Sequence, residues 1–441
     1  QADTLGKSVW RLACIRHRIR PDGFTGRSIK VKCLFLFQDA PLSPNYSGGA
    51  SRYLESFLAL VQLGVEVHVW RMLSIEQRDN ILNFEENEPG WKEKTHRLAC
   101  SWRDASYSQS FSPDRFEIFV RSLLDPIYVA FAPYTRLKNE FQETVRTVQP
   151  NFVWAEHTQS AALVSTSSIH LPWIYSHHDW WHKIVQVRRE LRKSPHYLSQ
   201  RMLDFALKRA EIVLAPKANV VISGSKTEAE ELSYLGARHV QVIPTTYPFT
   251  TVDLSQKVNV DKVRIVHLGG LNTTANYQGL LSYLERAHPQ IAAVLRNKVE
   301  LIVIGETRTA KSVLLEKLRE HGATLTGHVY DLSSVLSPYD IAIIPYEMNT
   351  GTRTKLGLLF SHAQVVVATQ AALSGSIEAQ HGENCLIVQS VDEFPQTIIN
   401  LANSPYERQG IGIAARSTFE AKFTIQSQAP KFKQVLSWLV M

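Results

Sequence analysis

The chain has 441 residues, of which 44% are hydrophobic, and its formal net charge is +7. This length exceeds one common domain core, so we expect two domains; no apolar run approaches the roughly 18 residues of a membrane span. The cysteines are scattered without metal-ligand spacing, which favours a reducing, cytoplasmic setting and argues against zinc. They are Cys14, Cys33, Cys100 and Cys385.

Most of the net positive charge lies in residues 1–32, which hold eight Lys and Arg against two Asp. We interpret residues 1–28 as a basic arm, either a solvated tail or a peripheral contact for anionic lipid at the inner face of the membrane. The arm lacks the apolar stretch of a secretory signal. The rest of the chain is close to neutral, which argues against nucleic-acid binding.

The first half of the chain begins with a βαβ pattern. Residues 29–37 are expected to form a strand, Gly48-Gly49 a turn, residues 53–63 a helix and residues 65–70 a second strand. The glycine pair is a weak signal by itself, since a simple tight turn explains it equally well. Residues 74–148 are interpreted as a variable insertion with helices near 113–132 and 135–148.

Two later strands end in polar clusters. Residues 151–155 are followed by Glu156-His157, and residues 172–176 are followed by a run of His, Asp and Trp. Because ligands of open α/β sheets bind beyond the carboxyl ends of strands, these clusters are site candidates. A packed aromatic corner is the alternative, and zinc is disfavoured because no second ligand cluster appears. The candidate acceptor-side residues are Glu156, His157, His177, Asp179 and Trp180, with His178 between them.

The second half repeats the βα rhythm after a Pro- and Thr-rich segment at 244–257. Strands are expected at 263–268, 299–304, 323–326, 341–345, 365–369 and 384–388. Helices are expected at 277–287, 312–322, 330–336, 356–360 and 390–402, and over most of 406–441. The first of these strands runs into Gly269-Gly270.

A glycine turn with two cations follows the strand at 341–345. It reads Thr350-Gly351-Thr352-Arg353-Thr354-Lys355, and a small-residue turn, Ser374-Gly375-Ser376, follows the next strand. Glycine lets backbone N–H groups approach an anion, while the helix N-terminus and the two cations add positive charge. This turn therefore suits a phosphate, although a solvated strand-to-helix turn fits the spacing too.

Taken together and in order, these motifs resemble a GT-B-fold retaining glycosyltransferase of the group-1 family. The similarity rests on Val266–Gly270, Leu301–Gly305, Tyr339–Pro345, Gly351–Lys355 and the His381-Gly382-Glu383-Asn384 turn. It implies an α/β fold with two Rossmann-like domains whose parallel sheets face a central cleft. We expect an acceptor-side domain at 29–246, a linker at 247–261 and a nucleotide-sugar domain at 262–441, whose last helix crosses back.

The resemblance also implies roles for individual residues. Arg353 and Lys355 match the cations at the donor diphosphate, and His178 matches the histidine at the donor sugar. The other implied donor contacts are Gly48, Gly49, Gly269, Gly270, Glu347, Thr350, Gly351, Thr352, Ser374, Gly375 and Ser376. The implied partners are a nucleoside-diphosphate sugar and a saccharide or lipid-linked acceptor, with neither metal nor cofactor.

Two positions depart from the family pattern. Leu358 stands where the family has a glutamate for the nucleotide ribose, and leucine accepts no hydrogen bonds. Glu347 or Glu378 would have to replace it. Residues 271–275 also lack the family's second basic pair, which leaves the diphosphate to Arg353 and Lys355. The sequence therefore predicts a glycosyltransferase, with an inactive GT-B scaffold that serves as a partner subunit as the alternative.

Overall fold

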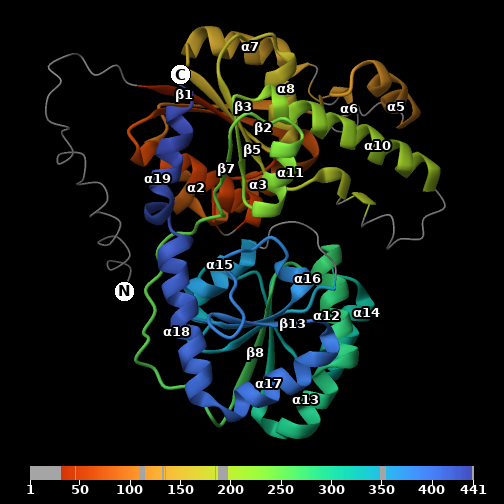
Figure 1. Cartoon of the computed structure of the whole chain (residues 1–441), viewed down its shortest axis with the longest axis vertical. Helices are drawn as coiled ribbons and strands as arrows, with labels where there is room; N and C mark the ends of the chain where they lie inside the picture. Colours follow the sequence, from red (N-terminus) through yellow and green to blue (C-terminus); the bar gives the residue numbers. More distant parts are fainter. Residues whose placement is uncertain are drawn as a thin grey trace, which may run out of the picture.

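The computed structural model describes residues 31–44, 46–108, 115–131, 134, 136–183, 185–186, 197–308, 310–347 and 354–439. The basic arm and the turn from Thr350 to Arg353 lie outside these ranges. The described chain forms two α/β halves stacked along the long axis of the molecule (Figure 1). Each half is built on one parallel sheet.

Among the described residues, the sheet of the first half has seven strands in the order β3-β2-β1-β4-β5-β6-β7. The strands are β1 (Lys32–Gln38), β2 (Glu66–Ser74), β3 (Ser101–Tyr107), β4 (Phe152–Glu156), β5 (Trp173–His177), β6 (Val220–Ser223) and β7 (Val240–Val242). All neighbouring pairs are parallel. The chain leaves β1 toward β2 on one side and returns to β4 on the other, so the switch point lies between β1 and β4.

The helices of the first half flank this sheet. They are α2 (Gly48–Gln62), α3 (Ile75–Asn87), α4 (Pro89–Leu98), α5 (Arg115–Leu124), α6 (Tyr128–Phe131), α7 (Leu137–Val148), α8 (His157–Thr166), α10 (Tyr197–Leu214) and α11 (Lys226–Tyr234). The helix expected from Tyr53 begins at Gly48, because the Ser47 hydroxyl accepts from the Ala50 N–H at 3.1 Å and caps it.

Residues 74–148 are not a simple insertion. They contain β3, which forms the edge of the first sheet by pairing with β2. Its alternate residues are largely exposed, so it lacks the apolar run that marks the central strands. The helical stretch expected near 113–132 is divided into α5 and α6, which are separated by a turn at Asp125 to Ile127.

In the described part of the second half, six strands are arranged in the order β10-β9-β8-β11-β12-β13. They are β8 (Val263–Leu268), β9 (Val299–Ile304), β10 (Thr324–Gly327), β11 (Ile341–Ile344), β12 (Val365–Thr369) and β13 (Cys385–Val388). Here the switch point lies between β8 and β11. The two sheets therefore share one topology, as their common βα rhythm predicts.

The helices of the second half are α12 (Thr274–Arg286), α13 (His288–Leu295), α14 (Ser312–Glu320), α15 (Thr354–Ser361), α16 (Gln370–Leu373), α17 (Phe394–Asn403), α18 (Pro405–Lys422) and α19 (Ile425–Ser437). The helix expected at 330–336 was wrong. Only a 3-10 turn forms there, at Leu332–Ser334, because Asp331 caps the Ser333 N–H and closes a tight turn.

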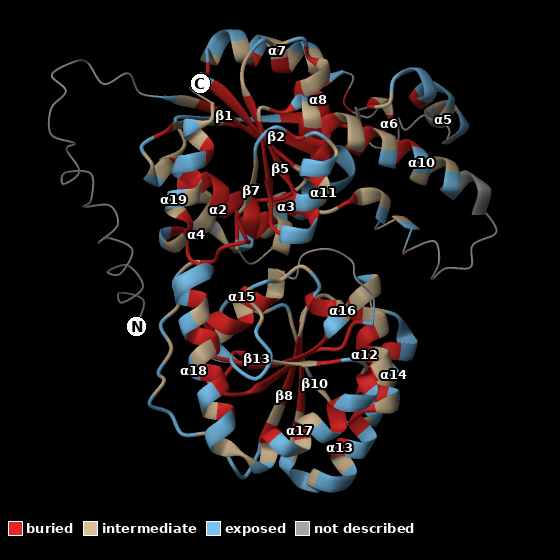
Figure 2. Cartoon of the chain, in the orientation of Figure 1, coloured by how far each residue is buried: buried red, intermediate tan, exposed pale blue. Residues whose placement is uncertain are grey.

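Both sheets are the centres of apolar cores, and Figure 2 shows buried strands beneath helices with exposed outer faces. The central strands β1, β4, β11 and β12 are apolar runs buried on both sides, as parallel sheets require. The last helix, α19, packs on α2 of the first half, and its Phe432 ring stacks on Trp154 at 6.0 Å. The end of the chain thus completes the core of its beginning.

The carboxyl ends of the two sheets face each other between the halves (Figure 1). The two halves approach each other closely at two glycines. A Cβ atom on Gly48 of α2 would lie 2.5 Å from Thr354 Oγ1, and one on Gly375 would lie 2.5 Å from Ser225 Oγ. The switch points of both sheets therefore open onto one interdomain region, where this topology binds ligands.

Candidate active site

The second half contributes a glycine corner at the end of β8. Gly269 and Gly305, which follow β8 and β9, have φ angles of +139° and +146°, values that favour glycine. A Cβ atom on Gly305 would collide with the Gly269 carbonyl. The two strand ends can approach this closely only without side chains, and they leave open backbone at the switch point.

Lys355 reaches this corner from the first turn of α15. Its ammonium donates to Asn276 Oδ1 at 2.9 Å, and also to the Leu268 carbonyl and the Tyr346 hydroxyl. A Cβ atom on Gly269 would lie 2.9 Å from Lys355 Nζ, so the glycine makes room for the cation. The structure therefore holds a positive charge between the ends of β8 and β11.

Two helix N-termini converge beside Lys355. α2 begins at Gly48 and α15 at Thr354, and these residues are in contact across the two halves. The Tyr247 hydroxyl donates to the Thr354 carbonyl and fixes α15 to the connection between the halves. A Cβ atom on Gly49 would have space around it, because the nearest atom outside the helix backbone, Ser47 Oγ, would lie 3.9 Å away. Because each helix N-terminus carries about half a positive charge, this region favours an anion.

The small-residue turn after α16 borders the same region. Gly375 has a φ of +85° and faces Ser225 of the first half, while Ser374 is exposed. Ser376 contributes to a small interdomain cavity beside Thr354. The cavity is lined by Gly224, Pro244, Thr245, Thr354, Leu356, Ser376, Glu378 and Phe423.

The first half contributes a histidine held by a buried carboxylate. His178 Nε2 lies 2.7 Å from Glu156 Oε2, and the Trp154 indole donates to Glu156 Oε1 at 2.7 Å. Burial raises the pKa of Glu156 and lowers that of His178. Since both carboxylate oxygens accept, we assign the imidazole proton to Nε2, which leaves the Nδ1 lone pair of a neutral His178 as an acceptor.

His157 and Arg52 surround this pair. The His157 ring is 5.2 Å from that of His178, and its Nδ1 lies 2.7 Å from Gln159 Oε1. Burial and the neighbouring His178 lower the pKa of His157 to about 3, so it is neutral. Its φ of +73° is uncommon for a residue other than glycine. Arg52, on α2, is buried, and Glu156 and Asp179 stabilise its charge.

Two residues predicted for the acceptor side belong to the core instead. His177 has no exposed surface and Trp180 is 3% exposed, and their rings pack together at 4.7 Å. An acceptor therefore cannot contact either of them in this structure. The cluster therefore contains a packed aromatic corner, one of the two readings that the sequence left open, and His178 remains the candidate site histidine.

Glu347 and Leu358 both have partners within the second half. The Glu347 carboxylate forms an ion pair with Arg286 at 2.9 Å, so it is directed toward α12. Leu358 is half-buried and packs on the apolar cluster around α15. By contrast, Glu378 lines the interdomain cavity, and burial raises its pKa.

Sequence reasoning missed Arg52, Asn276 and Tyr346. Arg52 lies one turn after Gly48, and Tyr346 lies two residues after the end of β11, so both positions carried a signal. Asn276, which donates to the Gly270 carbonyl at 2.7 Å, is an ordinary residue within a helix and gave none. Among the described residues, the site includes Lys355, Gly269, Thr354 and Ser376 from the second half and Gly48, His178, Glu156 and His157 from the first half.

The second half of the chain is similar in sequence to a known protein family. Residues 262–404 match the model of a family described as glycosyl transferases group 1. These residues are therefore similar to a group 1 glycosyltransferase domain. They include β8, α12 and Lys355, the second-half elements of the site. A search of curated protein sequences finds no significant match to the chain.

Solved structures show the same architecture. HepE from Anabaena, in complex with UDP and glucose, has a TM-score of 0.60 and 15% identity over 92% of this chain and 99% of its own. Sucrose-phosphate synthase from Thermosynechococcus elongatus has a TM-score of 0.65 and 13% identity, and covers 93% of this chain and 99% of its own. TarM has a TM-score of 0.67 and 10% identity over 93% and 99%. The fold is GT-B.

Proposed function

We propose that the protein transfers a sugar from a nucleoside-diphosphate sugar to a saccharide or lipid-linked acceptor, with retention at the anomeric carbon. The observation that carries the proposal is Lys355, held at the β8–β11 switch point beside two converging helix N-termini. The HepE structure contains UDP and glucose, which supports the choice of donor class.

In this proposal the site acts mainly on the leaving diphosphate. Its negative charge develops as the glycosidic bond breaks, and preorganised cations and N–H groups stabilise that charge. Lys355 and the N-terminus of α15 supply these groups, together with Arg353 from the turn outside the described residues. We propose that these cations take the place of a divalent metal, and that no cofactor is required.

The first half would order the sugar and the acceptor. The free Nδ1 lone pair of His178 accepts a hydrogen bond from a sugar hydroxyl, while Glu156 holds the ring orientation. Closing the two halves would exclude water and limit hydrolysis of the donor. We keep His157 and Asp179 as candidates for acceptor contact.

A donor screen tests the proposal. Uridine, guanosine and adenosine diphosphates and their sugars are titrated by calorimetry, and the best donor is then assayed for transfer. Lys355→Ala and Arg353→Ala should each lower turnover by about 10² or more, because each removes charge stabilisation at the leaving group. Lys298→Ala, at an exposed lysine of the same half, is the matched control. Binding of no nucleotide would instead favour the inactive-scaffold alternative.

We also propose peripheral contact with anionic lipid. Among the described residues, no helix has both the length and the apolar character needed to cross a bilayer. An apolar patch does occur on α5 and α10, which project sideways from the first half (Figure 1). Its exposed members are Phe116, Val120, Leu123, Leu124 and Phe205, with Arg121 and Lys208 beside them.

The arrangement suits the boundary between headgroups and acyl chains, where apolar side chains insert and cations meet anionic lipid. Leu124 is 90% exposed and Phe116 63%. In liposome sedimentation with anionic vesicles, Phe116→Ser/Leu124→Ser should lower partitioning about tenfold or more. Val294→Ser/Ile413→Ser, on the second half, is the control. Equal binding of both double variants, or binding that ignores anionic lipid, contradicts the proposal.

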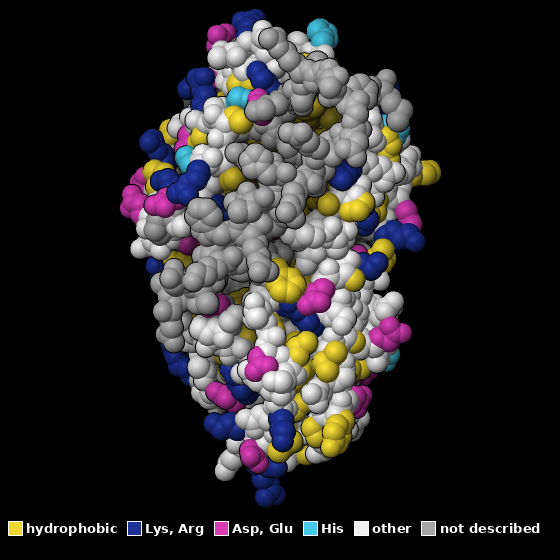
Figure 3. All heavy atoms as spheres, turned by 90° about the vertical axis from the view of Figure 1, so that its left-hand side faces the viewer, with side chains coloured by type: hydrophobic (Ala, Val, Ile, Leu, Met, Phe, Trp, Pro, Cys, Tyr) yellow, Lys and Arg dark blue, Asp and Glu magenta, His cyan; other side chains and the backbone are white. Residues whose placement is uncertain are grey.

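Nucleic acid is not among the proposed partners. On the face shown in Figure 3, the Lys and Arg side chains of the described residues are interspersed with Asp and Glu. A nucleic-acid surface would instead gather one sign of charge along a continuous path. On this face the described residues form no such path.

A further inference from the structure

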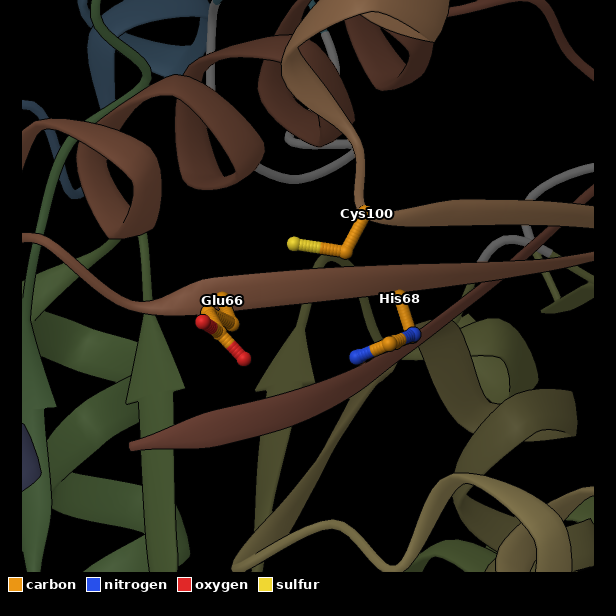
Figure 4. Close-up of side chains that lie close together, drawn as sticks. All are labelled: Glu66, His68 and Cys100. Atoms are coloured by element: carbon orange, nitrogen blue, oxygen red, sulfur yellow. The ribbon is translucent and has the colours of Figure 1, made fainter. Parts of the chain in front are cut away.

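A second cluster of chemically active side chains lies at the opposite end of the first sheet. Glu66 and His68 are alternate residues of β2, so they project from the same face of the strand, and Cys100 directly precedes β3. One ligand atom of each residue lies within 4.8 Å of the others. Figure 4 shows the thiol, the imidazole and the carboxylate directed into the same space.

The imidazole of His68 is oriented for a ligand. Its Nδ1 lies 2.8 Å from Ser101 Oγ, which fixes the ring from behind. Its Nε2 is buried and has no hydrogen-bond partner. A hydrogen bond to one ring nitrogen, with the other nitrogen left open, is typical of metal-binding histidines.

The backbone holds the other two groups in register. The Cys100 N–H donates to the Val67 carbonyl at 2.8 Å, and the Glu66 N–H donates to the Val31 carbonyl at 2.9 Å. Cys100 is a free, exposed thiol, whereas Cys33 and Cys385 are buried. Small side-chain rotations can therefore bring the three ligand atoms closer while the strands stay fixed.

We propose that Glu66, His68 and Cys100 bind a divalent cation of the zinc class. A thiolate, an imidazole and a carboxylate together suit borderline-soft metals, and three protein ligands leave a fourth position for water. The cluster lies at the amino ends of β2 and β3, away from Lys355 and His178 at the carboxyl ends. The cation would therefore tie the edge strand β3 to β2 and would take no part in sugar transfer.

The spacing of the residues hides this site in the sequence. His68 and Cys100 are separated by α3 and α4, so the chain shows no short metal motif, and zinc was disfavoured on that ground. Parallel pairing of β2 with β3 places His68 opposite Ser101 and so brings Cys100 alongside. The sheet register, and not the linear sequence, assembles the ligands.

Cobalt binding tests the proposal on the full chain. Titration with Co²⁺ should give one equivalent of binding with a thiolate-to-cobalt absorption band, and Zn²⁺ should displace it. Cys100→Ser should abolish the band, and His68→Ala should weaken Zn²⁺ binding about 100-fold. Ser101→Ala should weaken it about tenfold, because the His68 ring loses the hydrogen bond that orients it. Glu86→Gln and His170→Ala, at exposed positions elsewhere in the first half, are the controls.

Thermal unfolding provides a readout that is independent of the spectrum. Zn²⁺ should raise the Tm of the wild-type protein and of both controls, but not that of Cys100→Ser. Equal Zn²⁺ affinity in wild type and Cys100→Ser, or cobalt bound without a thiolate band, overturns the proposal. Nucleotide binding should be the same with and without Zn²⁺, so failure of this site and failure of the donor site are separate results.

Discussion

At the residue scale, position 358 holds a leucine, so another carboxylate is needed to bind the nucleotide ribose, and Glu378 is a candidate. Leu358 packs on an apolar cluster, and Glu347 forms an ion pair with Arg286. Glu378 instead lines the interdomain cavity together with Thr354 and Ser376. We infer that Glu378 is the carboxylate best placed to accept hydrogen bonds from the nucleotide ribose.

Glu378→Gln should therefore weaken binding of the preferred nucleoside diphosphate about 10- to 100-fold, the cost of a charge-assisted hydrogen bond. Glu347→Gln should change it less than about twofold, because an exposed ion pair contributes little. Calorimetry on both variants measures the difference. Equal losses would show that neither carboxylate has a specific role at the ribose.

The Glu156–His178 pair makes a second prediction at this scale. Glu156→Gln offers an amide N–H to the ring in place of a carboxylate, which favours the other His178 tautomer and protonates Nδ1. If Nδ1 must accept from the sugar, kcat should fall about 10²-fold or more, while the fold is retained. Imidazole ¹⁵N shifts report the tautomer directly.

The chain contains a matched control for this substitution. His182 Nδ1 lies 2.6 Å from Glu211 Oε2, so the same residue types pair at similar distance elsewhere in the first half. Glu211→Gln should leave kcat within about twofold, because neither residue is among the proposed sugar contacts. A large loss in Glu211→Gln, with none in Glu156→Gln, would remove His178 from the site.

At the scale of elements, the contact between α2 and α15 depends on one glycine. A Cβ atom on Gly48 would lie 2.5 Å from Thr354 Oγ1, whereas the nearest atom to one on Gly49 is 3.9 Å away. Gly48→Ala should force the two helix N-termini apart and lower kcat/KM about tenfold or more, because small displacements at a reacting centre are costly. Gly49→Ala should have little effect.

Donor-dependent transfer and Tm are measured for both alanine variants. We expect Gly48→Ala to lose activity with a small change in Tm, because its clash lies between the halves and not within a core. If Gly48→Ala and Gly49→Ala behave alike, the approach of α2 to α15 does not control the site.

The sequence predicted the elements whose local patterns agree with their tertiary roles. The buried strands β8, β11 and β12 are apolar runs, and Val263–Leu268 was placed to the residue. β3 was missed because an edge strand alternates polar and apolar residues weakly, and its identity depends on pairing with β2. The α5–α6 break was missed because the turn at Asp125 sits inside a helical pattern.

The site was predictable in part for the same reason. His178 directly follows β5, and Gly48 and Lys355 lie in the first turns of the helices that follow β1 and β11, where topology alone makes a residue a candidate. His177 and Trp180 also lie at or just after the end of β5, but their side chains are buried in the core. Asn276 could not be found, because its role arises only when α12 meets the end of β8. Roles that depend on contacts between distant elements are absent from local sequence.

At the scale of the whole molecule, the two halves are joined at Glu55. This carboxylate of α2 is buried and accepts from Thr246 Oγ1 of the interdomain connection at 3.0 Å. Burial raises the pKa of Glu55 to about 8, although Thr246 and Lys94 partly oppose the shift. The folded protein therefore holds a proton here that the unfolded chain loses near pH 4.5.

This difference in proton binding fixes the sign of a pH dependence. Between pH 4.5 and about 8 the folded state binds more protons at Glu55, so its contribution to the free energy of unfolding falls as the pH rises. Glu55→Gln keeps an acceptor for Thr246 and cannot ionise. The Tm of this variant relative to wild type should therefore increase from pH 5 to pH 8.5, as measured by calorimetry.

Glu86→Gln, on the exposed surface of α3, is the control, and its Tm difference from wild type should not vary with pH in this window. Parallel pH profiles for Glu55→Gln and wild type would contradict the raised pKa. Because Glu55 and Tyr247 fasten the same connection to α2 and α15, a charge at Glu55 should also loosen the closure of the halves. Transfer by the wild-type protein should then decline above about pH 8, and Glu55→Gln should shift that decline upward.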